Sequence, residues 1–244
     1  MSQFAQLHWL TLRNACLDDQ MQITSLTDCL YKFGMYKKIT SSITLSQCAK
    51  LQKLTLEHVH LGNVKLDLSE ALCLTEIRMC NVTMPSFILS HNTKLEELEL
   101  RNVVICDGKL DLLRAFSLAK VSINYMTMSS INLSWCIQLQ EVTLKNVKVG
   151  DGKLDFSGAS CLSKLFLNNI SMSSITLPEC TQLKEVTLEN VKLGDGKLDF
   201  SGASYLSKLC VNNMTMSRIT LHECTQLKEL TLENVKLGEA KLNL

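Results

Sequence analysis

The stretch LKEVTL at residues 183–188 recurs as LSKLCV at residues 206–211 and as LKELTL at residues 227–232. The three copies follow the pattern L-x-x-[LV]-x-L and are spaced 23 and then 21 residues apart. Apolar residues that alternate over such a short range predict a strand with one face in a core. Two of these half-units form a larger unit of 44 residues.

The 44-residue unit repeats along the whole chain without insertion or deletion. A leucine starts each unit, at Leu7, Leu51, Leu95, Leu139, Leu183 and Leu227, and residues 139–182 match residues 183–226 at 34 of 44 positions. A period of this length predicts a solenoid, whose units bury their apolar faces only by stacking on neighbours. We find no linker rich in serine or glycine, so residues 1–244 are predicted to form one elongated domain.

The half-unit that follows each predicted strand lacks helical character. The segment GDGKLDFSGA at residues 194–203 alternates apolar and polar residues, and its glycines Gly196 and Gly202 would weaken a helix. We therefore predict short extended return segments, little helix and shallow curvature.

The repeated L-x-x-L-x-L segments resemble those of the leucine-rich repeat family over essentially the whole chain. The resemblance implies a mainly β fold, an open right-handed solenoid of about eleven rungs, where a rung is one strand and its return segment. The phrases LDFSGAS and ITLxECTQL resemble repeats of cytosolic innate-immune receptors with nucleotide-binding domains, and also those of bacterial surface leucine-rich proteins.

The chain departs from the usual family pattern at the end of each predicted strand. The ninth motif position, commonly Asn or Cys in the family, is apolar here, as at Val147 and Val191. Asparagine stands one place earlier, as at Asn146 and Asn190. We therefore expect an outward-facing asparagine ladder instead of a buried one.

Composition excludes several classes of function. The 25 basic residues nearly balance the 24 acidic ones, which gives no electrostatic case for a nucleic acid or an anionic membrane as partner. No apolar run approaches the roughly 18–20 residues of a membrane span, and the first residues do not form a signal peptide.

Eleven cysteines are present, and several share one repeat position: Cys48, Cys136, Cys180 and Cys224, with Asn92 in the fifth copy. A small apolar side chain stacked in register explains this recurrence, and we expect reduced thiols and a cytoplasmic protein. Sequons at Asn81, Asn132, Asn169 and Asn213 would suit secretion, but three of them share one repeat position and count as a single copied feature.

No pattern in the chain points to catalysis, a cofactor or a metal. The GDGK segments beginning at Gly150 and Gly194 lack the spacing and the following Ser or Thr of a phosphate-binding loop. His58 and His60 flank a core position and are expected to face solvent. We expect no enzyme activity and no cofactor.

The third residue of each motif carries a charge whose sign alternates from Glu97 to Glu229. On stacked parallel strands these side chains would form a ladder of opposite charges, a structural feature worth roughly 0.2–1 kcal/mol per neighbouring pair.

Internal variation gives the best functional signal. The two most similar units differ sharply at surface positions, among them Lys145 against Glu189 and Phe166 against Cys210. Aromatic and arginine side chains often anchor protein partners. We therefore predict a partner-binding surface on the inner sheet face that contains Arg101, Tyr125, Lys145, Phe166, Glu189 and Cys210.

From these observations we predict that the chain is a protein-binding module, which recognises a protein ligand through its inner sheet. The resemblance implies the ligand-sensing repeat region of a cytosolic innate-immune receptor, with flanking domains expected in the parent protein. Two alternatives stay open: the substrate-recognition array of a ubiquitin ligase, and an extracellular adhesin-type leucine-rich protein.

Overall fold

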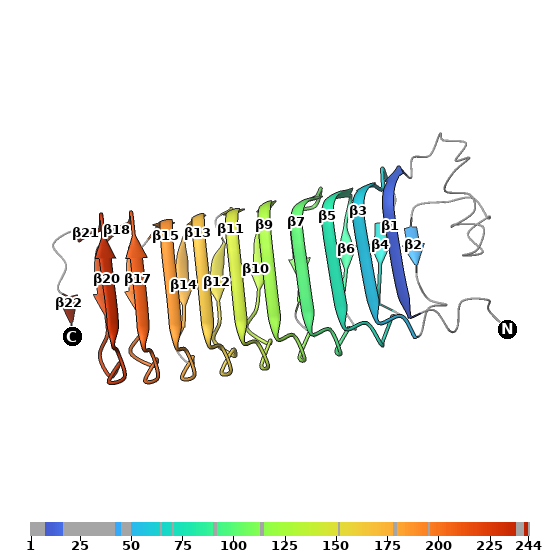
Figure 1. Cartoon of the computed structure of the whole chain (residues 1–244). Helices are drawn as coiled ribbons and strands as arrows, with labels where there is room; N and C mark the ends of the chain where they lie inside the picture. Colours follow the sequence, from blue (N-terminus) through green and yellow to red (C-terminus); the bar gives the residue numbers. More distant parts are fainter. Residues whose placement is uncertain are drawn as a thin grey trace.

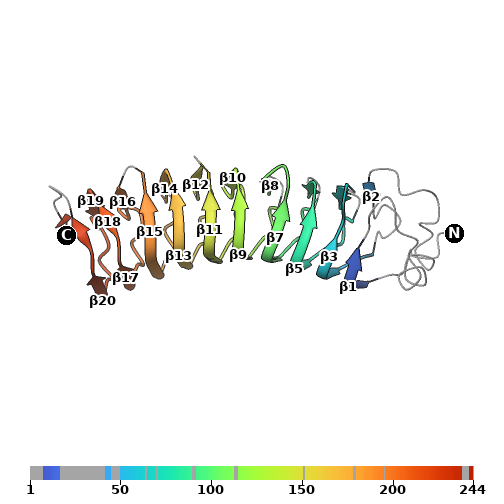
Figure 2. The same ribbon diagram turned by 90° about the horizontal axis from the view of Figure 1, so that it is seen from above.

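A computed structural model describes residues 8–16, 42–44, 50–63, 65–69, 71–89, 92–112, 115–150, 152–177, 180–194, 196–237 and 242–243. Ten parallel strands form one sheet, and Figures 1 and 2 show them in a single long row with little curvature. In spatial order they are β1 (Trp9–Cys16), β3 (Lys53–His60), β5 (Glu76–Met84), β7 (Glu97–Ile105), β9 (Lys120–Met128), β11 (Glu141–Val149), β13 (Lys164–Met172), β15 (Glu185–Leu193), β17 (Lys208–Asn212) and β20 (Glu229–Glu233).

Short strands form the return segments behind this sheet. Three groups of parallel strands are β2 (Ser42–Thr44), β4 (Lys65–Asp67) and β6 (Phe87–Ile88); β8 (Lys109–Asp111), β10 (Ser130–Asn132), β12 (Lys153–Asp155) and β14 (Ser174–Thr176); and β16 (Lys197–Asp199), β19 (Arg218–Thr220) and β22 (Leu242–Asn243). At the end of the long sheet, β18 (Thr215–Met216) continues β17 beyond Asn213 and pairs with β21 (Lys236–Leu237), which continues β20 in the same way. The described residues contain no helix, so none of them forms a helix able to cross a membrane. The prediction of a mainly β solenoid with extended return segments is confirmed.

The core lies between the long sheet and the return strands. In β13, Leu165 and Leu167 are buried while Lys164 is exposed and Phe166 is half-buried, which is the predicted alternation. Large side chains from the return half, such as Phe156 and Phe200, are also fully buried. Burying each such apolar side chain stabilises the fold by roughly 1.5–3 kcal/mol, and each rung obtains this burial from its neighbours.

The long sheet has ten strands where about eleven rungs are predicted. The long strand expected midway between β1 and β3 falls outside the described residues, and β1 pairs directly with β3. This pairing follows the 44-residue period, because Leu10 lies opposite Leu54 and Leu12 opposite Leu56. The number of stacked strands thus differs from the prediction, whereas the register of the apolar residues agrees with it.

The asparagine ladder has a backbone cause that the sequence pattern alone does not show. The eighth motif residue of every long-sheet rung has φ between 51° and 54°: Asn14, His58, Asn81, Asn102, Tyr125, Asn146, Asn169, Asn190, Asn213 and Asn234. Asparagine tolerates this left-handed conformation better than most residues. The local bend places two successive residues outside the core and returns the ninth residue to it. Val147 and Val191 are buried for this reason, and the usual buried asparagine is displaced.

The ladder side chains also bond one another along the row. Asn102 Nδ2 donates to Asn81 Oδ1 at 2.6 Å, and Asn169 Nδ2 donates to Asn146 Oδ1 at 2.7 Å. These amides are half-buried or exposed. The expected outward-facing ladder is therefore present.

Substitutions at Asn102 can separate the backbone role from the side-chain bond. Both Asn102→Gly and Asn102→Val remove the amide, but only valine resists a positive φ. We expect the valine variant to unfold about 1–2 kcal/mol more easily than the glycine variant, as measured by urea denaturation. Equal stabilities of the two variants would contradict a backbone role for this position.

Cysteine fills the place where the return segment turns toward the next long strand. The thiols of Cys136, Cys180 and Cys224 lie 4.0, 3.7 and 3.2 Å from the carbonyl oxygens of Leu112, Phe156 and Phe200. In the equivalent place Asn92 Nδ2 donates at 3.0 Å to the carbonyl oxygens of Leu68 and Ala71. This column satisfies the turn carbonyls that a buried asparagine ladder satisfies in the common family pattern.

Burial keeps the thiols of Cys136 and Cys224 protonated. It raises the pKa of the Cys136 thiol to about 12 and also raises that of Cys224, where Asp199 adds to the effect. A protonated thiol can donate to a carbonyl, whereas a thiolate cannot. Successive cysteines of the column stand two rungs apart, about 10 Å at the usual strand spacing, which is too far for a disulfide. None of the eight cysteines whose side chains the structure describes forms a disulfide.

Candidate functional site

The outer surface of the long sheet, called the front face below, consists of the third, fifth and seventh motif residues. Their side chains are exposed or half-buried on every described strand from β3 to β20, while the fourth and sixth residues are buried from β3 to β17. The front face therefore tolerates changes that do not touch the core. It is the surface on which the candidate binding residues were expected.

Four of the six candidate residues lie together on adjacent strands of this face. Phe166 on β13 lies one strand from Thr187 and two strands from Cys210 in the same row. In the neighbouring row, Lys145 on β11 lies two strands from Glu189. The structure thus joins Lys145, Phe166, Glu189 and Cys210 into one surface, which we call the Phe166 surface.

Phe166 is less exposed than expected. Its side chain is half-buried, and Lys145 Nζ lies 4.8 Å from the centre of its ring. A lysine over an aromatic ring is attracted by roughly 0.5–1 kcal/mol at exposed sites. Beside this pair, Asn168 Nδ2 donates to Glu189 Oε2. The Phe166 surface is therefore an organised cation–aromatic–amide–carboxylate group rather than an isolated ring.

The other two candidates lie elsewhere. Tyr125 occupies the left-handed eighth position of β9 and replaces asparagine in the ladder, with 58% of its surface exposed. Arg101 is exposed on β7, three strands from Phe166, or about 14 Å at the usual spacing. Both side chains are accessible, but Arg101 does not belong to the Phe166 surface.

The third motif residues form the expected charge row. Strand register places Lys120 between Glu97 and Glu141, and Lys208 between Glu185 and Glu229. Direct ion pairs join Lys120 to Glu141 at 3.8 Å and Lys208 to Glu229 at 2.8 Å. These charges are balanced along the row, which supports the structural interpretation of the ladder.

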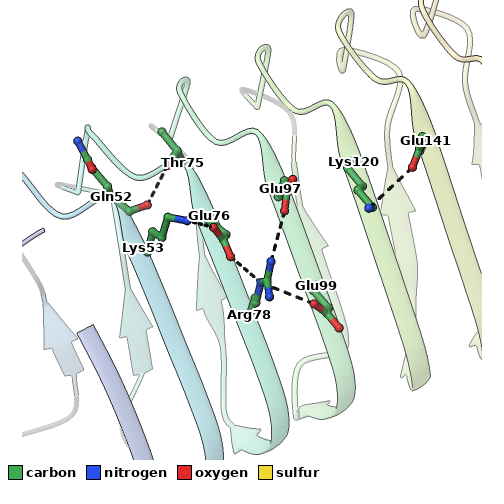
Figure 3. A network of polar contacts seen from close by, with 9 residues as sticks. All are labelled: Gln52, Lys53, Thr75, Glu76, Arg78, Glu97, Glu99, Lys120 and Glu141. Carbon is green, nitrogen blue, oxygen red and sulfur yellow. Dashed lines mark hydrogen bonds and ion pairs between the residues drawn. The ribbon is translucent and has the colours of Figure 1, made fainter. Parts of the chain in front are cut away.

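One arginine compensates for the place where this alternation fails. Glu76 and Glu97 lie opposite each other, and Arg78 contacts both, at 2.5 and 3.7 Å, as well as Glu99 at 3.8 Å (Figure 3). Lys53 pairs with Glu76 at 2.6 Å from the other side. The hydrogen bond from Lys53, with help from Arg78, holds the pKa of Glu76 below its ordinary value, although burial opposes the shift.

The lowered pKa predicts how Glu76 contributes to stability at different pH values. A carboxyl group that binds its proton more weakly in the folded chain stabilises the fold above its unfolded pKa of about 4.5. That stability is lost as the pH falls through the lower folded pKa. We expect Glu76→Gln to lower the free energy of unfolding by about 0.2–1 kcal/mol at pH 7 and by progressively less below pH 4.5.

Urea denaturation across the pH range would measure this difference. Glu99→Gln is the matched control, because Glu99 is half exposed and contacts Arg78 only at 3.8 Å. The control should cost less stability at pH 7. A Glu76→Gln deficit that stays constant through the acid range would contradict the proposed electrostatic role.

Arg78 was missed by the sequence interpretation, although the same comparison of repeats could have found it. Most other strands carry Thr, Ser or Cys at the fifth motif position, where Arg78, Glu99 and Phe166 stand out.

A second group that the sequence interpretation missed lies at the turns that precede β9 and β11, where Phe116, Trp135 and Ile137 are exposed by 40%, 56% and 46%. Polar residues fill these repeat positions in later copies, so the fold does not require the apolar side chains.

Within the described ranges, no group of three or more His, Cys, Asp or Glu side chains could hold a metal ion. His58 and His60 are both exposed, and His58 takes the left-handed eighth position. Neither residue is part of the Phe166 surface.

Comparison with known proteins finds similarity in solved structures alone. No protein-family model and no curated protein sequence matches it. Among solved structures, the functional domain of InlJ from Listeria monocytogenes, which includes a cysteine ladder, is similar with a TM-score of 0.58 and 22% identity over 82% of this chain and 43% of that one. TLR13 in complex with ssRNA13 is similar with a TM-score of 0.53 and 15% identity over 95% of this chain and 36% of that one.

The chain thus spans less than half the length of either matched structure. The two likenesses cover 82% and 95% of this chain, whose L-x-x-L-x-L segments form the parallel strands of the long sheet. Motif, topology and structural likeness together show that this chain has the leucine-rich repeat solenoid fold.

Proposed function

We propose that this protein is a non-enzymatic recognition module that binds a protein partner through the Phe166 surface. The observation that carries this proposal is the Lys145–Phe166 pair, in which a cation lies over an aromatic ring at a motif position where most other strands carry Thr, Ser or Cys. Phe166 adds no core packing, because its side chain lies on the front face. Half-exposed aromatic residues beside charged groups are typical anchors of protein interfaces.

The biological setting that suits this module best is the ligand-sensing region of a cytosolic innate-immune receptor. Two observations support it: the repeat phrases resemble those of such receptors, and the fold is similar to that of TLR13, a protein solved with an RNA ligand. The cysteines whose side chains the structure describes are thiols rather than disulfides, which fits a reducing compartment. A cytoplasmic location is therefore part of the proposal.

A specific observation favours a second setting, an extracellular adhesin-type protein. The InlJ domain is similar in fold and includes a cysteine ladder, as this chain has a cysteine column. The state of the thiols distinguishes the two settings. Unfolding of natively expressed protein in the presence of an alkylating agent and without reductant, followed by mass spectrometry, should show all eleven cysteines modified. Two or more cysteines protected as disulfides would favour the extracellular setting.

Affinity purification with quantitative mass spectrometry tests the binding surface. The double variant Phe166→Ala with Lys145→Ala removes the anchor without touching the core. Tyr205→Ser is the matched control, because Tyr205 is an exposed aromatic residue on a turn, where earlier copies carry Ser117 and Cys161. We expect the control to retain the partners of the natural sequence and the double variant to lose them. Equal retention by both variants would overturn the proposal.

A further inference from the structure

A groove lined mainly by amide side chains runs across four strands where the long strands end. It has a volume of about 780 Å³, which is in the range of small-ligand sites. The lining residues are Asn146, Asn168, Asn169, Asn190, Val191, Lys192, Leu193, Asn213 and Thr215. The groove lies beside the Phe166 surface and contains none of its four residues.

Hydrogen bonds within the ladder leave a regular pattern of open groups in this groove. Asn169 donates to the Oδ1 of Asn146, and Asn213 donates to the Oδ1 of Asn190. Among the described residues, the Nδ2 groups of Asn146 and Asn190 and the Oδ1 groups of Asn169 and Asn213 bond no other side chain. A donor and an acceptor therefore alternate from strand to strand, about 4.8 Å apart.

The fold does not account for every amide in the groove. The left-handed eighth position explains Asn146, Asn169, Asn190 and Asn213. Asn168 stands at the seventh position, which has no positive φ and varies from strand to strand, with Arg101, Asn124 and Lys145 among its residues.

An aromatic residue holds the ladder position on the strand next to the groove. Tyr125 replaces asparagine on β9, and its exposed ring follows Asn146 in the ladder. A planar ring beside a row of amides combines an apolar stacking surface with directional hydrogen bonds.

The charge of the groove decides between classes of ligand. Lys192 is the one charged residue among those that line it, and the nearby carboxylate of Glu189 accepts from Asn168. Tight binding of a nucleic acid requires several cations to neutralise phosphates, and this groove does not supply them. Hydroxyl groups both donate and accept, so a polyhydroxylated chain can satisfy the alternating amides.

We propose that this groove binds a linear neutral oligosaccharide. Hydroxyl groups of successive sugars bond the open amides of Asn146, Asn169, Asn190 and Asn213, and one sugar ring stacks on Tyr125. This site is separate from the proposed protein-binding function, because Phe166 and Lys145 do not line the groove.

Isothermal titration calorimetry with two probes, a β-1,4-linked and a β-1,3-linked glucose hexasaccharide, tests the proposal on the full chain. Asn190→Asp retains a residue type that tolerates positive φ and keeps Oδ1 for Asn213, but removes the open donor. Tyr125→Asn restores the common ladder residue and removes the ring. Asn234→Asp is the matched control, because Asn234 has the same backbone conformation outside the groove.

We expect at least one hexasaccharide to bind, with affinity at least tenfold weaker in Asn190→Asp and in Tyr125→Asn and unchanged in Asn234→Asp. Phe166→Ala should also leave this affinity unchanged, so that failure here is distinguishable from failure of the protein-binding proposal. Absence of binding by both hexasaccharides at millimolar concentration, or equal affinity in Asn190→Asp, would overturn the proposal. So would preferential binding of a single-stranded RNA probe that the Asn190→Asp variant weakens.

Discussion

Leu165→Ala is expected to lower the free energy of unfolding by roughly 2–5 kcal/mol, whereas Phe166→Ala, at the next position, should lower it by less than about 1 kcal/mol. Leu165 is 2% exposed and lies in register with the buried residues Val142 and Val186 on the two adjacent strands. Alanine would leave a cavity that neighbouring rungs cannot fill, because both are already close-packed. Phe166 contributes to the stability of the fold mainly through its contact with Lys145.

Urea denaturation followed by circular dichroism would measure both variants under the same conditions. A solenoid can lose one end before the rest, so the comparison should include the slope of the transition as well as its midpoint. Leu167→Ala, which removes another buried leucine of the same strand, should behave like Leu165→Ala. If Phe166→Ala destabilises as much as Leu165→Ala, the assignment of strand faces is wrong and the proposed binding surface lies in the core.

The regular repeat made the strands and their faces predictable. Each apolar position recurs every 44 residues. If the assignment of strand faces were shifted by one residue, polar residues would therefore lie in the core at all rungs. The return strands were predictable for a related reason, because the segment from Gly194 to Ala203 alternates apolar and polar residues and contains glycine. These are local signals, repeated often enough to determine the fold.

The roles of the two polar columns depended on three-dimensional information. The displacement of asparagine to the eighth position was visible in the sequence, but the positive φ that causes it was not. Likewise, the recurrence of Cys136 and Cys224 indicated stacking, whereas their contacts with the turn carbonyls required coordinates. In both cases the sequence gives the identity of the side chain. It does not give the backbone conformation that explains why this side chain occupies its position.

The candidate site was predictable in part because strand order is fixed by the repeat. Lys145, Phe166, Glu189 and Cys210 come from adjacent rungs and therefore lie close together. Arg101 comes from a rung three strands away from Phe166, and the repeat itself separates the two. The contact between the Lys145 ammonium group and the Phe166 ring depends on side-chain conformation, which the repeat pattern does not specify.

Gly158→Ala is the second substitution with a large expected effect. A Cβ atom at Gly158 would lie 1.9 Å from the carbonyl oxygen of Ser134 and 3.1 Å from its carbonyl carbon, both backbone atoms of the preceding rung. A contact of 1.9 Å is far inside van der Waals distance, so one of the two turns has to move.

Neither turn can move without losing hydrogen bonds. Ser134 receives support from Asn132, whose Oδ1 accepts from the Ser134 amide at 3.0 Å and from its hydroxyl at 2.7 Å. The Gly158 carbonyl accepts from the Ser160 amide at 3.0 Å. We therefore expect Gly158→Ala to lower the free energy of unfolding by roughly 1–3 kcal/mol, the usual range for overpacking a close contact.

Gly150→Ala supplies the matched control for this measurement. The nearest atom to a Cβ at Gly150 is 3.5 Å away, and the residue does not have a positive φ. Alanine there should leave stability unchanged or raise it by about 0.4–1 kcal/mol, because it restricts the unfolded chain more than glycine does. Urea denaturation of both variants then isolates the steric contribution. If Gly158→Ala proves as stable as Gly150→Ala, the turns at Ser134 and Gly158 do not limit how closely successive rungs stack.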